Sequence, residues 1–151
     1  MNSASVDNLV YNDMALAPFT AAAAVELIPE TGLDFWGLEV VMIGQGGLGD
    51  VLIAPDFASN NTIWISYVEA GEDNTCGSAV ARATLARGGD SAALSNVEVI
   101  WRQMPKTSGR GHYSHRMAFT PDGKLLITSG DRQLQDTAQD FSVNLGKPGE
   151  S

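Results

Sequence analysis

Both histidines of the chain, His112 and His115, lie in one glycine-rich segment, SGRGHYSHR (108–116). A neutral histidine in a cleft is well suited to act as a general base near pH 7. A Ser–His nucleophile pair is conceivable, but the sequence lacks the GxSxG turn that exposes such a serine. The two histidines could also share a metal ion, although no third ligand stands nearby. The segment alone predicts either a catalytic base or a plain surface loop.

Asp131 follows the run LLITS (125–129), which predicts a strand. An aspartate at a strand end can orient a histidine and stabilise its protonated form. The same residue can instead cap a turn and pair with the adjacent Arg132. The residues themselves leave both interpretations open.

The segment GQGGL (44–48) places three glycines within four positions, just ahead of a predicted strand. Glycines allow the backbone to approach a ligand closely or to bend tightly. The segment is not the GxGxxG dinucleotide fingerprint, because no helix is predicted after it. Gln45 is its one side chain able to form a hydrogen bond with a substrate, and an ordinary turn is the alternative.

A series of short β-strands must position these residues. Apolar and β-branched runs bounded by turn residues predict strands at 50–54, 62–68, 79–85, 97–103, 116–120 and 124–128. The turns Pro55-Asp56 and Pro121-Asp122 lie 66 residues apart, each between two of these strands, with four strands in each period. A recurring four-stranded antiparallel unit is typical of a β-propeller blade. A β-sandwich whose hairpins share turn chemistry is the alternative fold.

The composition limits the partners. The 151 residues have the size of a single domain. With 18 acidic and 9 basic side chains the net charge is −9, which disfavours nucleic acid and anionic lipid surfaces. No apolar run approaches the ~20 residues that a membrane-spanning helix needs. Cys76 is the single cysteine, so the chain has no internal disulfide, and a structural zinc site is not expected.

The first 33 residues differ from the rest, because they are rich in alanine and contain no Lys or Arg. They predict a loosely ordered lead-in, with a short strand at Val25–Ile28 as the alternative. A secretory signal needs a basic segment ahead of an apolar one, and neither is present in usable form. Residues 34–151 then form the folded domain.

Seven segments carry a family resemblance when they are taken in order. They are DFWGL (34–38), GQGGLGDVLIAPDF (44–57), IWISY (63–67), AVARATL (79–85), VEVIWRQ (97–103), GRGHYSHRMAFTPDGKLLITSGDR (109–132) and AQDFSVNLGK (138–147). Together they resemble the glucose/sorbosone dehydrogenase family, the soluble quinoprotein aldose sugar dehydrogenases. Each motif is weak alone, and their common order and spacing make the resemblance specific.

The resemblance implies a six-bladed β-propeller that binds pyrroloquinoline quinone (PQQ) in a central basin, with calcium holding the cofactor. By motif position His112, and not His115, matches the base that acts on the C1 hydroxyl of an aldose. Hydride then passes to the quinone, the sugar becomes a lactone, and an external acceptor takes the electrons. Gln45 matches a glutamine that lines the cofactor and substrate site, and Asp131 matches the aspartate that supports the base.

The chain also departs from the family. It lacks the proline of the family's FPWGL, and only Glu39 to Ile43 separate DFWGL from GQGGL, so most strands of a first blade are missing. We therefore expect an all-β, incomplete propeller of about two four-stranded blades, a fragment that lacks much of the cofactor site. The resemblance places the calcium ligands outside this chain, and we assign no metal ligand within it. Open sheet edges would favour association between copies or with other chains.

Two other functions stay open at this stage. One is a non-catalytic β-propeller binding module in which the histidine segment is only structural. The other is a metal-dependent propeller hydrolase of sugar lactones, which would need clustered carboxylates that the sequence does not display. The resemblance implies a periplasmic or secreted protein, although the sequence shows no export signal.

Overall fold

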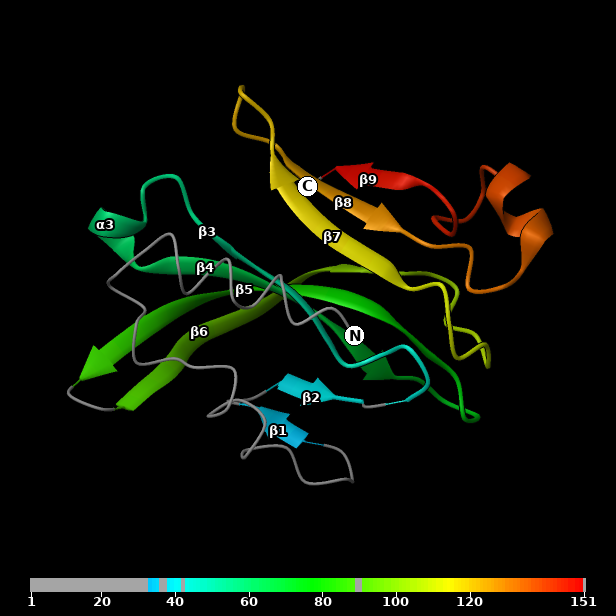
Figure 1. Ribbon diagram of the computed structural model, residues 1–151, viewed down its shortest axis with the longest axis horizontal. Helices are drawn as coiled ribbons and strands as arrows, with labels where there is room; N and C mark the ends of the chain where they lie inside the picture. The colour runs from blue at the N-terminus through cyan, green and yellow to red at the C-terminus, as the bar shows by residue number, and fades with distance from the viewer. Residues whose placement is uncertain (1–32, 36–37, 42, 89–90, 151) are drawn as a thin grey trace.

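The computed structural model describes residues 33–150, apart from residues 36, 37, 42, 89 and 90 (Figure 1). The predicted lead-in therefore lies outside the described residues except for Leu33. The alternative strand at Val25–Ile28 lies outside them as well.

The described residues form three antiparallel sheets with two short helical segments between their strands. The elements are β1 (Leu33–Phe35), β2 (Leu38–Val40), β3 (Leu48–Ile53), α3 (Phe57–Asn60), β4 (Thr62–Ala70), β5 (Cys76–Gly88), β6 (Ser91–Arg102), β7 (Ser114–Phe119), β8 (Leu125–Ser129), η2 (Gln135–Gln139) and β9 (Pro148–Glu150). The sheets have the strand orders β1-β2, β3-β4-β5-β6 and β7-β8-β9. The all-β prediction is confirmed, and all six predicted strands are present.

Each Pro-Asp turn joins the first strand of a sheet to the second. Pro55-Asp56 lies between β3 and β4, and Pro121-Asp122 lies between β7 and β8. The second turn is tight and places Gly123 at a φ of 86°, a backbone conformation that glycine adopts without steric cost. The first turn continues into α3, a single helical turn that the sequence did not predict. The repeat therefore marks the same hairpin in two successive sheets.

The hairpin between β5 and β6 is longer than predicted. The sequence analysis ended the third strand at residue 85 and began the fourth at 97, but β5 continues to Gly88 and β6 begins at Ser91. Pairs such as Leu85 with Leu94 keep the two strands in register there. Alanine and serine have a weak intrinsic strand preference, so the neighbouring strand decides their conformation.

The four-stranded sheet is covered on both faces (Figure 1). On one face Ile63 and Ile65 form a buried cluster with Leu38 of β2. On the other face Val80 packs with Met117 and further buried residues of the β7-β8-β9 sheet. Successive antiparallel sheets that pack face to face are the arrangement expected of neighbouring propeller blades. The β3-β4-β5-β6 sheet, called the first blade from here on, has four strands, and the β7-β8-β9 sheet, called the second blade, has three within the described residues.

Asp50 and Gly49 of β3 lie in direct contact with the second blade. Asp50 Oδ2 accepts a hydrogen bond from the Met117 N–H at 3.0 Å and lies 3.3 Å from Arg116 Nε. A Cβ atom at Gly49 would overlap the imidazole of His115. His115 is 6% exposed, and this burial, with a smaller effect of the Arg132 charge, lowers its pKa to about 4. The buried histidine is therefore neutral at neutral pH.

We predict that Gly49→Ala destabilises the chain by about 1–3 kcal/mol, because the added methyl group collides with His115 and forces the blades apart. Urea unfolding measures the change in the free energy of unfolding. The double variant Gly49→Ala/His115→Ala serves as the control, because it removes the ring that the methyl group meets. Additive losses in the double variant would show that the two residues do not contact each other.

We also predict that the chain loses stability as the pH falls from 6.5 to about 4, the interval between the ordinary and the lowered pKa of His115. The unfolded chain binds the proton in this interval and the folded chain does not, so the loss reaches at most about 3 kcal/mol. Urea unfolding across this range should show a flatter pH dependence for His115→Gln. Equal slopes in both proteins would contradict the assignment.

Candidate functional site

The three predicted site residues come from three loops at one end of the two blades. Gln45 lies in the loop before β3, His112 lies just before β7, and Asp131 follows β8. Because β7 and β8 are antiparallel, the start of one strand lies beside the end of the other. The structure brings the three residues together.

Gln45 contacts the histidine loop through both its side chain and its backbone. Its Oε1 accepts a hydrogen bond from the His112 N–H at 2.9 Å, and its own N–H donates to the Arg110 carbonyl oxygen at 3.0 Å. Gly44 has a φ of 60°, and a Cβ there would overlap the same Arg110 oxygen. The glycine of the GQGGL segment is therefore needed for close contact between two loops.

His112 and Asp131 form a side-chain pair with His112 Nδ1 at 2.8 Å from Asp131 Oδ1. The same Oδ1 accepts a hydrogen bond from the Gln133 N–H at 2.9 Å. The His112 contact, followed by the Gln133 N–H, lowers the pKa of Asp131 below its usual value of 3.8. An ionised carboxylate only accepts hydrogen bonds, so a neutral His112 carries its proton on Nδ1 and leaves Nε2 free to accept one.

The two histidines have opposite surroundings. The His112 side chain is 55% exposed, and its Nε2 has no hydrogen-bond partner among the described residues. His115 is buried between the blades, and its Nδ1 has no hydrogen-bond partner in the described part of the chain. The geometry supports the choice of His112 over His115 as the candidate base, and the catalytic role itself stays a prediction.

Arg132 lies elsewhere than the sequence suggested. The turn interpretation paired it with the adjacent Asp131, but Arg132 is fully buried and is in none of the ion pairs of the described residues. Its guanidinium donates to the carbonyl oxygens of Cys76 and Gly111, at 2.7 and 3.0 Å. No sequence signal separates this arginine from an exposed one, because burial depends on segments that are distant in the chain.

Gln103 was also missed as a residue near the site. It is fully buried, and its Nε2 donates to Ser129 Oγ at 2.8 Å and to the Gly130 carbonyl oxygen at 3.0 Å. A Cβ at Gly130 would overlap the His112 carbonyl group. Gln103 therefore fixes the strand end where Asp131 begins, and Gly130 lets the histidine loop approach it.

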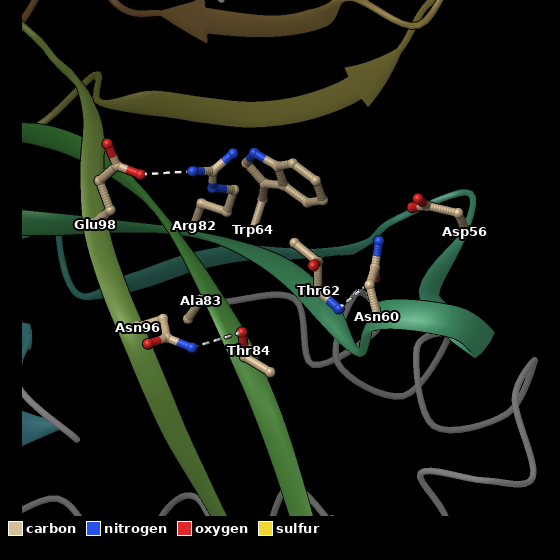
Figure 2. Close-up of a pocket in the computed structure, with 9 residues that line it drawn as sticks. All are labelled: Asp56, Asn60, Thr62, Trp64, Arg82, Ala83, Thr84, Asn96 and Glu98. Atoms are coloured by element: carbon tan, nitrogen blue, oxygen red, sulfur yellow. Dashed lines mark hydrogen bonds and ion pairs between the residues drawn. The ribbon is translucent and has the colours of Figure 1, made fainter.

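A groove of 470 Å³ opens on the four-stranded sheet away from these residues (Figure 2). Its lining includes Trp64 and the ion pair of Arg82 and Glu98, whose charged atoms lie 2.7 Å apart. Both charged side chains are more than half exposed, and an exposed pair of this kind contributes little to stability. The groove does not include Gln45, His112 or Asp131, so it is separate from the candidate site.

Within the described ranges, no group of three or more His, Cys, Asp or Glu side chains could hold a metal ion. None of the helices that the structure describes has the length and apolar character needed to cross a bilayer.

Comparison with known proteins shows which family the chain resembles. The family model "Glucose / Sorbosone dehydrogenase" matches residues 24–148. The "Aldose sugar dehydrogenase YliI" of Escherichia coli is 41% identical over 104 residues, which are 69% of this chain and 28% of that protein. The solved apo structure of the soluble E. coli aldose sugar dehydrogenase has a TM-score of 0.70 and 37% identity, covering 82% of this chain and 34% of that one.

A second solved structure contains the cofactor. The PQQ-bound aldose sugar dehydrogenase of Streptomyces coelicolor has a TM-score of 0.64 and 26% identity, covering 74% of this chain and 31% of that one. The chain thus spans about a third or less of the length of these relatives. A shorter likeness, 73% identity over 45 residues, joins 30% of the chain to 16% of "Bifunctional protein FolD 3" of Roseobacter denitrificans. So short a stretch is less than a domain and carries no function to this chain.

We predict that His112→Ala raises the pKa of Asp131, because it removes the hydrogen bond that lowers this pKa most. NMR titration of the Asp131 carboxyl carbon measures the change. Asp140 is the matched control, since contacts with Ser142 lower its pKa and do not involve His112. An unchanged Asp131 titration in the variant would show that the two side chains do not interact in solution.

Proposed function

The chain belongs to the glucose/sorbosone dehydrogenase family, and from this premise we propose that the whole protein is a PQQ-dependent oxidoreductase of aldose sugars. The single observation that carries the proposal is the exposed His112 whose Nδ1 is held by Asp131 at 2.8 Å. This is the arrangement that a general base requires. The two residues also stand at the family's motif positions for the base and its supporting aspartate.

The proposed reaction begins with proton removal from the sugar. His112 Nε2 accepts the proton of the C1 hydroxyl while the C1 hydrogen leaves with its electron pair and the carbonyl of the lactone forms. Asp131 keeps the Nδ1 proton in place and offsets the positive charge that develops on the imidazole. PQQ, when bound, supplies the acceptor for the hydride, which no side chain of the protein can supply.

Among the described residues, Gln45 fits part of a quinone site. Gln45 Oε1 is occupied by the His112 N–H, and its amide nitrogen has no partner in the described part of the chain. That nitrogen can donate a hydrogen bond to a quinone or sugar oxygen beside His112. The described residues hold no group of three or more His, Cys, Asp or Glu side chains that could bind calcium. No step of the mechanism is assigned to it.

We extend the proposal to the substrate, the electron acceptor and the location of the protein. An aldose is the substrate, an external acceptor takes the electrons from the reduced cofactor, and the protein acts in the periplasm or outside the cell. Association through sheet edges also stays a proposal. Its physical basis is that a strand with an unpaired edge offers backbone groups to another chain.

We predict that His112→Asn lowers kcat by about 10²- to 10⁴-fold, because the variant has no base to take the C1 hydroxyl proton. The assay uses a hybrid in which residues 44–147 replace the matching stretch of the E. coli aldose sugar dehydrogenase. Aldose-dependent dye reduction with added PQQ gives kcat and KM.

Arg82→Ala in the same hybrid is the matched control, since it alters a charged residue of the separate groove. It should leave kcat within a factor of about two, the range expected of an exposed ion pair. A His112→Asn hybrid that works as fast as its parent would remove His112 from the mechanism. A hybrid that binds neither PQQ nor sugar would favour a non-catalytic binding module.

A further inference from the structure

Arg132 is 0% exposed, although a buried arginine usually has a carboxylate partner. None of the ion pairs in the described part of the chain includes it. Its guanidinium donates instead to backbone carbonyl oxygens of Cys76 and Gly111, at 2.7 and 3.0 Å, and to that of Gly109. Its Cζ atom lies 3.7 Å from the centroid of the Tyr113 ring. The charge is therefore stabilised by oriented carbonyl dipoles and by an aromatic face.

Two of the three bonded carbonyls belong to the loop that carries the candidate base. Gly109 and Gly111 flank Arg110 immediately before His112, and glycines have no side chain with which to fix the loop. The Arg132 N–H also donates to the His112 carbonyl oxygen at 3.3 Å. His112 has a φ of 51°, a conformation that a non-glycine residue keeps only where its surroundings hold it.

Arg132 is also the next residue after Asp131. One guanidinium therefore connects the histidine loop to the strand end that carries the supporting carboxylate. We propose that Arg132 is a positioning residue, which holds the His112 loop so that Nδ1 meets the Asp131 carboxylate before a substrate binds. The expected effect of Arg132 on kcat rests on the proposed function, whereas its expected effect on the contact between His112 and Asp131 does not.

Lysine cannot reproduce these contacts in full. The guanidinium is a planar fork that reaches the two loop carbonyls and the Cys76 carbonyl from different nitrogens. An ammonium group presents its donors from a single point and does not stack on a ring in the same way. We therefore expect the His112 loop to be held partly in place in Arg132→Lys and to be released in Arg132→Met.

The Asp131 carboxyl reports on the position of the loop. In Arg132→Met the loop moves, the hydrogen bond from His112 weakens, and the Asp131 pKa rises toward its usual value of 3.8. NMR titration of the Asp131 carboxyl carbon in the 151-residue chain measures this pKa. His112→Ala, which removes the hydrogen bond completely, gives the largest pKa shift expected. Arg132→Lys should lie between Arg132→Met and the parent. A folded Arg132→Met chain that titrates like its parent would overturn the proposal.

Ile65→Ala is the matched control for a merely structural role. Ile65 is also buried, but it lies in the cluster with Leu38 on the other face of the four-stranded sheet, and its apolar side chain forms no hydrogen bond with Arg132 or with the histidine loop. The control should lower stability and leave the Asp131 pKa low. If it shifts the Asp131 titration as far as Arg132→Met does, general loosening explains both results and the proposal fails.

Where Arg132→Met does not fold, Arg132→Lys carries the comparison. Where neither folds, the unaltered chain supplies the test. The Nε–H of Arg132, bonded to the Gly111 carbonyl, should then exchange slowly with solvent. Rapid exchange of this proton would show that the guanidinium does not hold the loop.

The kinetic test uses the hybrid enzyme described above. Arg132→Met should lower kcat by about 10- to 100-fold with little change in KM, because the base is misplaced while the sugar contacts remain. Arg132→Lys should restore part of kcat. An unchanged kcat in an active hybrid overturns the positioning role. If the hybrid without substitutions has no activity while Arg132→Met shifts the Asp131 titration in the 151-residue chain, the proposed function is refuted and the positioning role is supported.

Discussion

The buried guanidinium of Arg132 imposes the constraint on which the rest of the site depends. A charge removed from water must be matched by well-placed acceptors, or it destabilises the fold by several kcal/mol. Here the acceptors are carbonyls of β5 and of the histidine loop, together with Gln103 Oε1 at 3.4 Å. Gln103 in turn bonds to Ser129 and Gly130 at the end of β8. The network joins the two blades and the loop between them into one arrangement.

This arrangement separates the positioning of the candidate base from its chemistry. Buried groups fix the backbone on either side of His112, while the imidazole itself is exposed and contacts Asp131 through Nδ1. The ionised aspartate determines which ring nitrogen carries the proton. Gln45 adds a side-chain contact from the other blade. Under the proposed function the residues of this chain handle the proton, and the redox chemistry belongs to the cofactor.

The packing between the blades explains why the site can be held so closely. The first blade is apolar on both faces, with the second blade on one and β2 on the other. Gly49 has no side chain, so the His115 ring fits against β3. Asp50 then bonds to the backbone of β7. Both contacts lie beside the loops of the candidate site, and a change in blade spacing would alter the distance between Gln45 and His112.

The sequence by itself determined the strands, the repeated Pro-Asp hairpin and the order of the motifs that identify the family, because these depend on neighbouring residues. It also brought His112, Asp131 and Gln45 forward as candidates. It missed the extension of β5 and β6 through the alanine-rich hairpin, since strand pairing overrides a weak local preference. It missed the burial of Arg132 and Gln103, because burial also depends on segments that are distant in the chain. Only the tertiary structure brings the carbonyls of β5 and of the histidine loop, with the side-chain amide of Gln103, around one guanidinium. These contacts decide whether an arginine is exposed or holds a site together.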